Sequence, residues 1–91
     1  MRIRWTAPAA ADLEQIKNYL EEQHPQFAQP TVRRIYESIR SLKFSPYRGR
    51  VGRRSGTREL LLPSLPYIVV YWIKGETVEV LHIYHGAQDR P

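Results

Sequence analysis

The chain has 91 residues and a formal net charge of +5, and it contains no cysteine. A chain of this length forms one domain with a modest hydrophobic core, so we expect residues 1–91 to be a single domain. The lack of thiols excludes disulfides, cysteine nucleophiles and thiolate metal sites, and it suits the reducing cytoplasm. No apolar run is long enough to span a membrane, and the N-terminal residues lack the apolar core of a signal peptide. We therefore expect a cytoplasmic protein that does not associate with membranes.

The first quarter of the sequence predicts a strand followed by a helix. Arg2–Trp5 alternates polar and apolar residues, which is typical of a short strand. Thr6 can cap the N-terminus of a helix that runs from Ala9 to Gln23, and the His24-Pro25 pair ends it. One face of this helix is apolar and consists of Ala9, Leu13, Ile16 and Leu20.

A second amphipathic helix follows after a short link. Residues 26–29 can begin it, but Pro30 fits best at its first position, where the missing N–H has no partner to lose. Its apolar stripe consists of Val32, Ile35, Ile39 and Leu42. The two helices form an αα-hairpin, and their stripes need an apolar surface from elsewhere in the chain.

Three strands in the second half of the chain supply that surface. They are Thr57–Leu62, Tyr67–Ile73 and Thr77–His85, and a tight turn at residues 74–76 joins the last two. Tyr67–Ile73 is β-branched or aromatic at nearly every position, which predicts a central strand covered on both faces. The element order β-α-α-β-β-β predicts an α+β fold: an N-terminal strand, a helical hairpin, and then an antiparallel sheet of three further strands.

Positive charge is concentrated in one segment, residues 43–58, termed the arginine loop. The segment holds six basic residues and no acidic one, so the rest of the chain is nearly neutral. The six are Lys43, Arg48, Arg50, Arg53, Arg54 and Arg58. Glycines and Pro46 exclude a helix or a long strand through its middle, so we expect a mobile loop that binds an anionic partner. The alternative is a solvated surface that only aids solubility.

The last strand carries the residues that are most suggestive of chemistry. His82 and Tyr84 fall on one face, and His85 falls on the other with Leu81 and Ile83. The two histidines therefore do not form a metal pair, and we expect no metal site. An imidazole here is either a structural hydrogen-bonding residue or a general base beside arginines that stabilise a phosphate. The loop glycines lack the lysine–serine end of a nucleotide-binding loop, so we expect no cofactor.

Five motifs, taken in order, make the chain resemble the RelE/ParE superfamily, the toxins of type II toxin–antitoxin modules. They are W-T-x-x-A-x-x-D-L (Trp5–Leu13), Gly49-Arg50, Gly56-Thr57-Arg58-Glu59-Leu60, Pro66–Tyr71 and His85-Gly86-Ala87-Gln88-Asp89. The resemblance covers nearly the whole chain. The fold that it implies agrees with the fold predicted from periodicity.

The superfamily divides by target. RelE-like members resemble one another in a catalytic set of lysine, arginine and a late tyrosine or histidine that cuts mRNA on the ribosome, whereas ParE-like members poison DNA gyrase without that set. In this chain Ile68 follows Tyr67 where many ribonucleases have arginine, and Gln88 stands where relatives have arginine. The resemblance therefore implies a gyrase poison that inhibits growth without being an enzyme. The alternative is a ribosome-dependent endoribonuclease, with Arg58, Tyr84 and His85 as candidate catalytic residues.

The resemblance also implies a cognate antitoxin that is acidic and partly disordered before it binds, so we expect a hetero-oligomer. The candidate antitoxin contacts are Leu13, Ile16, Leu20, Ile35 and Arg50. The target is DNA gyrase or, in the alternative, the ribosome with mRNA. The candidate target contacts are Arg48, Arg50, Arg53, Arg54 and Arg58.

Overall fold

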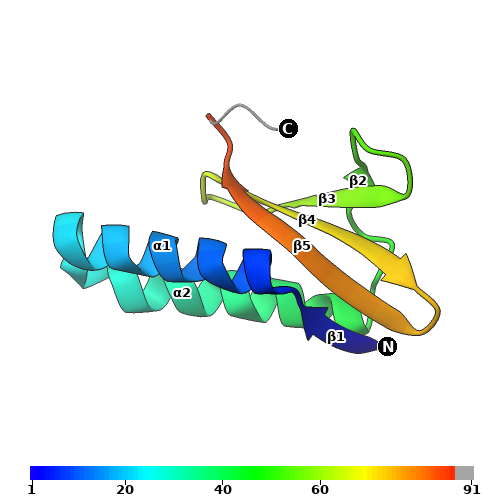
Figure 1. The fold of residues 1–91 in the computed structure, drawn as a ribbon. Helices are drawn as coiled ribbons and strands as arrows, with labels where there is room; N and C mark the ends of the chain where they lie inside the picture. The colour runs from blue at the N-terminus through cyan, green and yellow to red at the C-terminus, as the bar shows by residue number, and fades with distance from the viewer. Residues whose placement is uncertain (88–91) are drawn as a thin grey trace.

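A computed structural model, which describes residues 1–87, has two layers, a sheet and a pair of helices on one of its faces (Figure 1). The elements are β1 (Arg2–Trp5), α1 (Ala7–Gln23), α2 (Pro25–Arg40), β2 (Arg50–Val51), β3 (Thr57–Leu61), β4 (Tyr67–Lys74) and β5 (Thr77–His85). A short 3-10 turn at Ser41–Lys43 follows α2. The expected α+β class is confirmed, with one strand and two helices followed by the remaining strands, and β2 is an addition to the predicted order. Within residues 1–87, no helix has the length and apolar character needed to cross a bilayer.

Within residues 1–87 the sheet has five strands, in the order β1-β5-β4-β3-β2. β1 lies parallel to β5, with Arg2 opposite Thr77 and Trp5 opposite Val80, and the other neighbours are antiparallel. A parallel pair needs a long connection, and here it is residues 6–76, which contain the helical hairpin and strands β2, β3 and β4. The fifth strand, β2, lies inside the arginine loop and was not predicted, because two residues are too few to give a periodic signal.

The helix boundaries follow capping chemistry. The Thr6 hydroxyl accepts a hydrogen bond from the Ala9 N–H at 3.4 Å and donates one to the Val80 carbonyl at 2.6 Å, which fixes the start of α1 against β5. The expectation that α2 begins at Pro30 is wrong, since α2 begins at Pro25 and Pro30 lies inside it. Pro25 takes the first helical position, where its missing N–H costs nothing. Pro30 has no N–H to donate to the Gln26 carbonyl, but Gln26 is exposed, so water can hydrogen-bond to that carbonyl instead.

The hydrophobic core lies between the hairpin and one face of the sheet. Its buried members are Ala9, Ile35, Ile39, Leu42, Leu60, Leu62, Tyr67, Val69, Tyr71, Val78, Val80 and Ile83. Along β4, buried residues alternate with half-buried ones, so the expectation of a strand covered on both faces is wrong. The hairpin forms a single layer and covers only one face. The opposite face, termed the outer face, keeps its apolar side chains only half-buried.

A bulge in β5 changes which residues share the outer face. The register shifts between Val70, which is opposite His82, and Tyr71, which is opposite Val80, so Leu81 has no partner. His82 and Tyr84 lie on one face, as predicted. Leu81, however, lines an outer-face depression with Val70 and His82, whereas it was expected on the face opposite His82, with Ile83 and His85.

Candidate functional site

The arginine loop is held in place by the buried phenol of Tyr71, which reaches it from the central strand. The Tyr71 hydroxyl accepts a hydrogen bond from the Gly49 N–H at 2.9 Å and donates one to the Pro46 carbonyl at 2.7 Å. A Cβ at Gly49 would lie 2.6 Å from that hydroxyl, so a larger residue cannot fit without a shift. Burial raises the pKa of Tyr71, against the lowering effects of the Gly49 hydrogen bond and nearby arginines, so the phenol stays a donor. The expectation of a mobile loop is therefore wrong for this part of the segment.

Arg58 forms a second clamp on the same stretch of backbone. Its guanidinium donates to the Gly49 carbonyl at 2.7 Å and to the Tyr47 carbonyl at 3.3 Å, and it lies 5.0 Å from the centre of the Tyr47 ring. None of these Arg58 contacts within residues 1–87 is with a carboxylate. Arg58 thus has a structural role, and among residues 1–87 its contacts are with backbone carbonyls and an aromatic ring.

Arg50 is paired with an acid that the sequence analysis did not single out. Its Nε and a terminal nitrogen donate to Glu59 Oε1 at 3.2 and 2.9 Å. The Glu59 side chain is only 5% exposed, whereas that of Arg50 is 54% exposed. A buried carboxylate needs such a partner, so Arg50 serves the fold as well as any ligand. One signal was available: Glu59 is the first acid after the six basic residues and lies in a strand next to the loop.

The remaining loop arginines have few internal contacts. Arg48 makes one long hydrogen bond, 3.4 Å, to the Ser38 carbonyl. Arg53 and Arg54 are exposed, and no hydrogen bond or ion pair of their side chains is recorded within residues 1–87. Both border the small outer-face depression of about 70 Å³ beside Glu59 and His82. They are therefore the loop arginines most available to an anionic partner.

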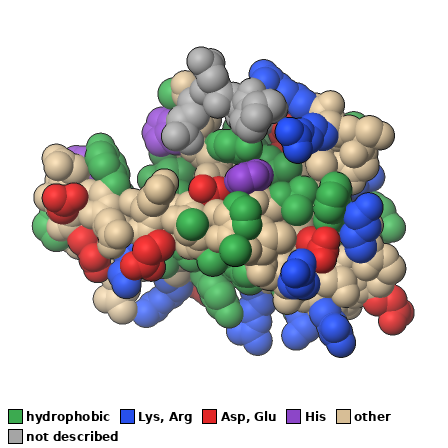
Figure 2. Space-filling view, viewed as in Figure 1, with side chains coloured by type: hydrophobic (Ala, Val, Ile, Leu, Met, Phe, Trp, Pro, Cys, Tyr) green, Lys and Arg blue, Asp and Glu red, His purple; other side chains and the backbone are tan. Residues whose placement is uncertain are grey.

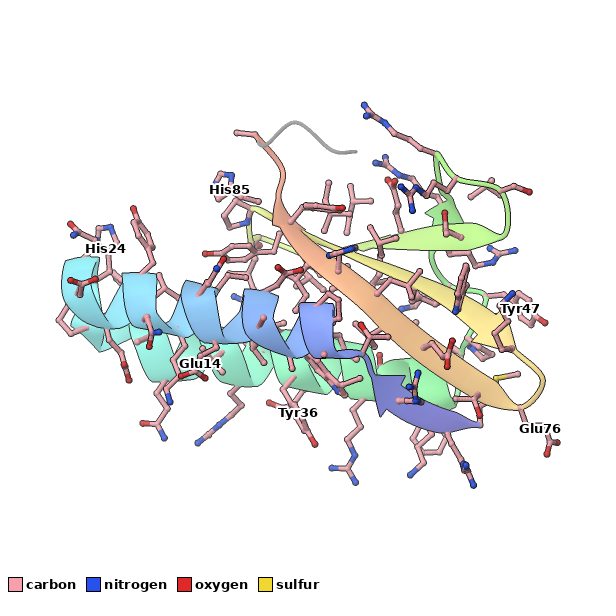
Figure 3. The ribbon with its side chains drawn as sticks, in the orientation of Figure 1. Glu14, His24, Tyr36, Tyr47, Glu76 and His85 are labelled. Carbon is pink, nitrogen blue, oxygen red and sulfur yellow. The ribbon has the colours of Figure 1, made fainter. Side chains whose placement is uncertain are left out.

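The three candidate catalytic residues do not converge. Arg58 is opposite Tyr71 and His85 is opposite Tyr67, and four residues along β4 correspond to about 13 Å. Figure 3 shows His85 at one end of the sheet and Tyr47, whose carbonyl Arg58 holds, at the other. Tyr84 is on the outer face, whereas the His85 ring packs against Tyr67, 5.7 Å between ring centres. Gln88 and Asp89, the last residues of the terminal motif, lie outside the described residues.

His82, rather than His85, lies near the arginines. Its Nδ1 is 3.2 Å from Asp12 Oδ2, and that oxygen also accepts the Ile83 N–H at 2.9 Å. Asp12 thereby completes the edge of β5 beyond the end of β1. The His82 ring stacks on Tyr84, with 5.4 Å between ring centres. Among residues 1–87, no three histidines, aspartates or glutamates are grouped as metal ligands would be.

The helices extend past the end of the sheet (Figure 1). Side chains of this helix overhang and of the adjoining ends of β4 and β5 line a groove. The groove has a volume of about 620 Å³. Its apolar lining includes Ile16, Tyr19, Leu20, Leu65, Tyr67 and Ile83. Two of the residues expected to contact an antitoxin, Ile16 and Leu20, line this groove, although Leu20 is only 8% exposed. Ile35 is 0% exposed and is removed from that set, because helix-to-sheet packing occupies it fully.

Figure 2 shows how charge divides along the same view. Acidic side chains gather over the overhanging end of the helices, and most lysine and arginine side chains lie toward the other end. Hydrophobic side chains occupy the surface between them. The candidate surfaces are thus an apolar groove at one end and a basic loop at the other.

Comparisons with known proteins agree on one family. Residues 3–90 match the family model described as the ParE toxin of the type II toxin–antitoxin system, parDE. Y4kP of Sinorhizobium fredii, a provisionally assigned toxin, is 41% identical over 90 residues, which span 99% of this chain and 93% of that protein. Toxin RelE2 of Caulobacter vibrioides is 32% identical over 87 residues, covering 96% of this chain and 97% of the relative.

Solved structures give the same answer. A chain of the chromosomal ParDE system from P. aeruginosa matches with a TM-score of 0.85 and 30% identity, covering 93% of this chain and 95% of that one. A chain of the RelBE2 toxin–antitoxin complex from Mycobacterium tuberculosis matches with a TM-score of 0.59 and 25% identity, over 96% and 92% of the two chains. The family match spans nearly the whole chain, and the fold described above is shared with the ParDE structure. The chain therefore belongs to the ParE toxin family of type II toxin–antitoxin systems, within the RelE/ParE superfamily.

Proposed function

We propose that this ParE-family toxin arrests growth by binding DNA gyrase and stabilising a cleaved gyrase–DNA state, and that it does not cut mRNA. The observation that carries the proposal is the dispersal of the ribonuclease-type residues. A gyrase poison requires only a surface with higher affinity for the cleaved state than for the other states of the enzyme. It needs no general base and no group that stabilises a phosphorane.

RNA cleavage has a stricter geometric requirement. A base and a positive group must both lie within hydrogen-bonding reach of one phosphodiester. Arg58 holds two loop carbonyls at one end of the sheet, and His85 packs on Tyr67 at the other end. Tyr84 lies on the opposite face of the sheet from His85, as their partners Ile68 and Tyr67 on β4 do. No single phosphate can contact all three side chains.

One observation favours the ribonuclease alternative. Arg53, Arg54, His82 and Tyr84 border the same outer-face depression. However, the depression is about 70 Å³, too small for a nucleobase when ligand pockets are typically about 300–1,000 Å³. The carboxylate of Glu59 also borders it, which disfavours a phosphate there. In addition, His82 is already paired with Asp12. For these reasons RNA cleavage at this depression is only the second candidate function.

Two assays separate the candidates. The first measures supercoiling of relaxed plasmid by purified gyrase and traps cleaved DNA with detergent. The second measures cleavage of mRNA on programmed ribosomes. We expect inhibited supercoiling and accumulated linear DNA, with intact mRNA, and we expect added antitoxin to reverse the effect. Cut mRNA together with unaffected gyrase would replace the proposal with the alternative.

We further propose that the antitoxin places an apolar segment in the groove under the helix overhang. Ile16 and Leu20 line that groove, and Tyr19, which is 56% exposed, stands at its rim. The longest dimension of the molecule is 38 Å, which an extended segment of about 11 residues spans. A single acidic antitoxin segment can thus occupy the groove and still reach Arg53 and Arg54.

The groove assignment is tested by a matched pair of charge substitutions. Tyr19→Glu is expected to weaken antitoxin binding at least tenfold in calorimetric titration, because it places a carboxylate in an apolar contact. Tyr36→Glu is the control, since Tyr36 is 52% exposed but lies outside the groove. We expect the control to bind within about twofold of wild type. Equal losses in both variants would remove the groove from the interface.

A further inference from the structure

The most exposed apolar side chains cluster in the arginine loop. Among residues 1–87 the three large hydrophobic residues with the greatest exposure are Phe44 at 82%, Val51 at 78% and Tyr47 at 64%. All three fall within residues 44–51, in the segment that carries the excess positive charge. Single exposed hydrophobic residues are common, but a cluster on a basic surface is characteristic of an interaction site.

Two of these residues share one depression. Tyr47 and Val51 line a shallow site of about 550 Å³ together with Ile73 and Arg58, at the end of β4. Phe44 precedes Tyr47 by three residues in the same connection. In Figure 3, Tyr47 projects from the end of the molecule that is remote from the overhanging helices. We term this surface, made of Tyr47, Val51, Arg58 and Ile73 together with the neighbouring Phe44, the loop-end patch. It is distinct from the groove assigned to the antitoxin.

The backbone that carries the loop-end patch is fixed. Tyr71 binds both Pro46 and Gly49, and Arg58 binds the carbonyls of Tyr47 and Gly49. Val51 belongs to β2, which pairs with β3 opposite Arg58. A pre-organised backbone lowers the entropic cost of binding, and rigid tyrosine and arginine side chains are typical anchors of protein interfaces.

The charge around the patch defines its complement. Lys43 lies over the Phe44 ring at 6.0 Å and Arg58 over the Tyr47 ring at 5.0 Å. No acidic residue occurs from residue 43 to residue 58. A complementary ligand therefore combines carboxylates, which pair with the cations, and an apolar side chain, which covers the patch.

We propose that the loop-end patch docks an acidic protein segment of the toxin's target, one that presents an apolar side chain flanked by carboxylates. The inference rests on the proposed function in that this target is DNA gyrase, and it adds that the first contact is with protein rather than with DNA. Val51 favours protein over nucleic acid, because an aliphatic side chain offers no stacking surface to a base. The rings of Phe44 and Tyr47 already each have a cation over one face.

The test uses two variants with the same pair of residue types removed. Phe44→Ala with Tyr47→Ala deletes the patch, and Phe27→Ala with Tyr36→Ala is the control, since Phe27 and Tyr36 are 56% and 52% exposed outside it. Neither variant changes charge. Three quantities are measured for the full chain: growth arrest on induction, the concentration that half-inhibits purified gyrase, and antitoxin affinity as a check on folding. Anisotropy with single-stranded and duplex oligonucleotides measures binding to nucleic acid.

We expect the patch variant to lose growth arrest and to need at least tenfold more protein to inhibit gyrase, with antitoxin affinity within about threefold of wild type. The control is expected to match wild type. If the patch variant loses toxicity although wild-type toxin leaves gyrase unaffected, the docking inference stands and the gyrase proposal fails. Retained toxicity in the patch variant overturns the inference, whatever the gyrase result. Oligonucleotide binding that is lost in parallel with toxicity also overturns it, in favour of a nucleic-acid surface.

Discussion

Replacing Tyr71 with phenylalanine tests how the arginine loop is held. The change removes one hydroxyl and leaves both the Gly49 N–H and the Pro46 carbonyl without the phenol. Gly49 is buried, and an unsatisfied buried N–H costs about 1–3 kcal/mol. Pro46 is partly exposed, so water can replace the phenol there and the added cost is small. We expect a loss of about 2 kcal/mol in the free energy of unfolding, which is about 10 °C in Tm for a domain of this size.

The assay is urea and thermal unfolding followed by circular dichroism, with hydrogen exchange at the Gly49 amide as a local readout. Tyr47→Phe is the control, because that residue is 64% exposed and no hydrogen bond of its hydroxyl is recorded within residues 1–87. The control is expected to stay within about 0.5 kcal/mol of wild type. A loss below that value for Tyr71→Phe, with Gly49 exchange unchanged, would refute the view that the phenol anchors the loop.

Four further outcomes follow from the contacts. In urea titrations Arg50→Gln is expected to cost about 2 kcal/mol, because it removes charge-assisted hydrogen bonds to a buried carboxylate, whereas Arg53→Gln with Arg54→Gln is expected to change stability by about 0.5 kcal/mol or less. The same double variant is expected to reduce growth inhibition at least tenfold. If growth arrest is undiminished, these two arginines serve only the solubility of the loop. His85→Ala is expected to leave growth arrest intact in a variant that still binds antitoxin; loss of arrest there would favour RNA cleavage. Finally, burial raises the folded-state pKa of Tyr71, so its stabilising effect is complete below the unfolded pKa of about 10 and is lost as pH rises through the folded value. The stability gap between wild type and Tyr71→Phe is therefore expected to narrow in urea titrations above pH 10, and a constant gap would contradict this.

Periodicity in the sequence was sufficient to predict the main elements. The strand expected at Thr77–His85 has those bounds, and the one expected at Tyr67–Ile73 extends by a single residue. Such predictions succeed because each depends on the alternation of a local run of residues. The α+β arrangement followed from the need to cover two apolar helical stripes.

Predictions from the sequence were wrong where two local structures were equally compatible with the residues. Pro25 and Pro30 both suit the first turn of a helix, and the decision depended on whether the interruption inside α2 faces solvent. The bulge at Leu81 could not be predicted either, because an alternating pattern does not show where one residue is left out of the strand pairing.

The candidate sites were predicted only in part, because they are assembled from distant segments. The Arg50–Glu59 pair depends on how β2 aligns with β3, and the Asp12–His82 pair joins the first helix to the last strand. Composition located the basic loop correctly. It did not reveal which of its arginines hold the fold and which, such as Arg53 and Arg54, are available to a ligand.

The parallel pairing of β1 with β5 has a consequence for how the toxin is made. Within residues 1–87, β1 pairs with no strand other than β5, and its partners there are residues 77–80. Contacts between such remote segments slow folding, because a long loop must close before any of them form. On the ribosome, residues 2–5 are synthesised before the other elements of the fold, and their partner strand emerges only after residues 6–76. Shorter nascent chains lack both β5 and the part of the core that it completes, so the folded domain cannot form before its translation is nearly finished.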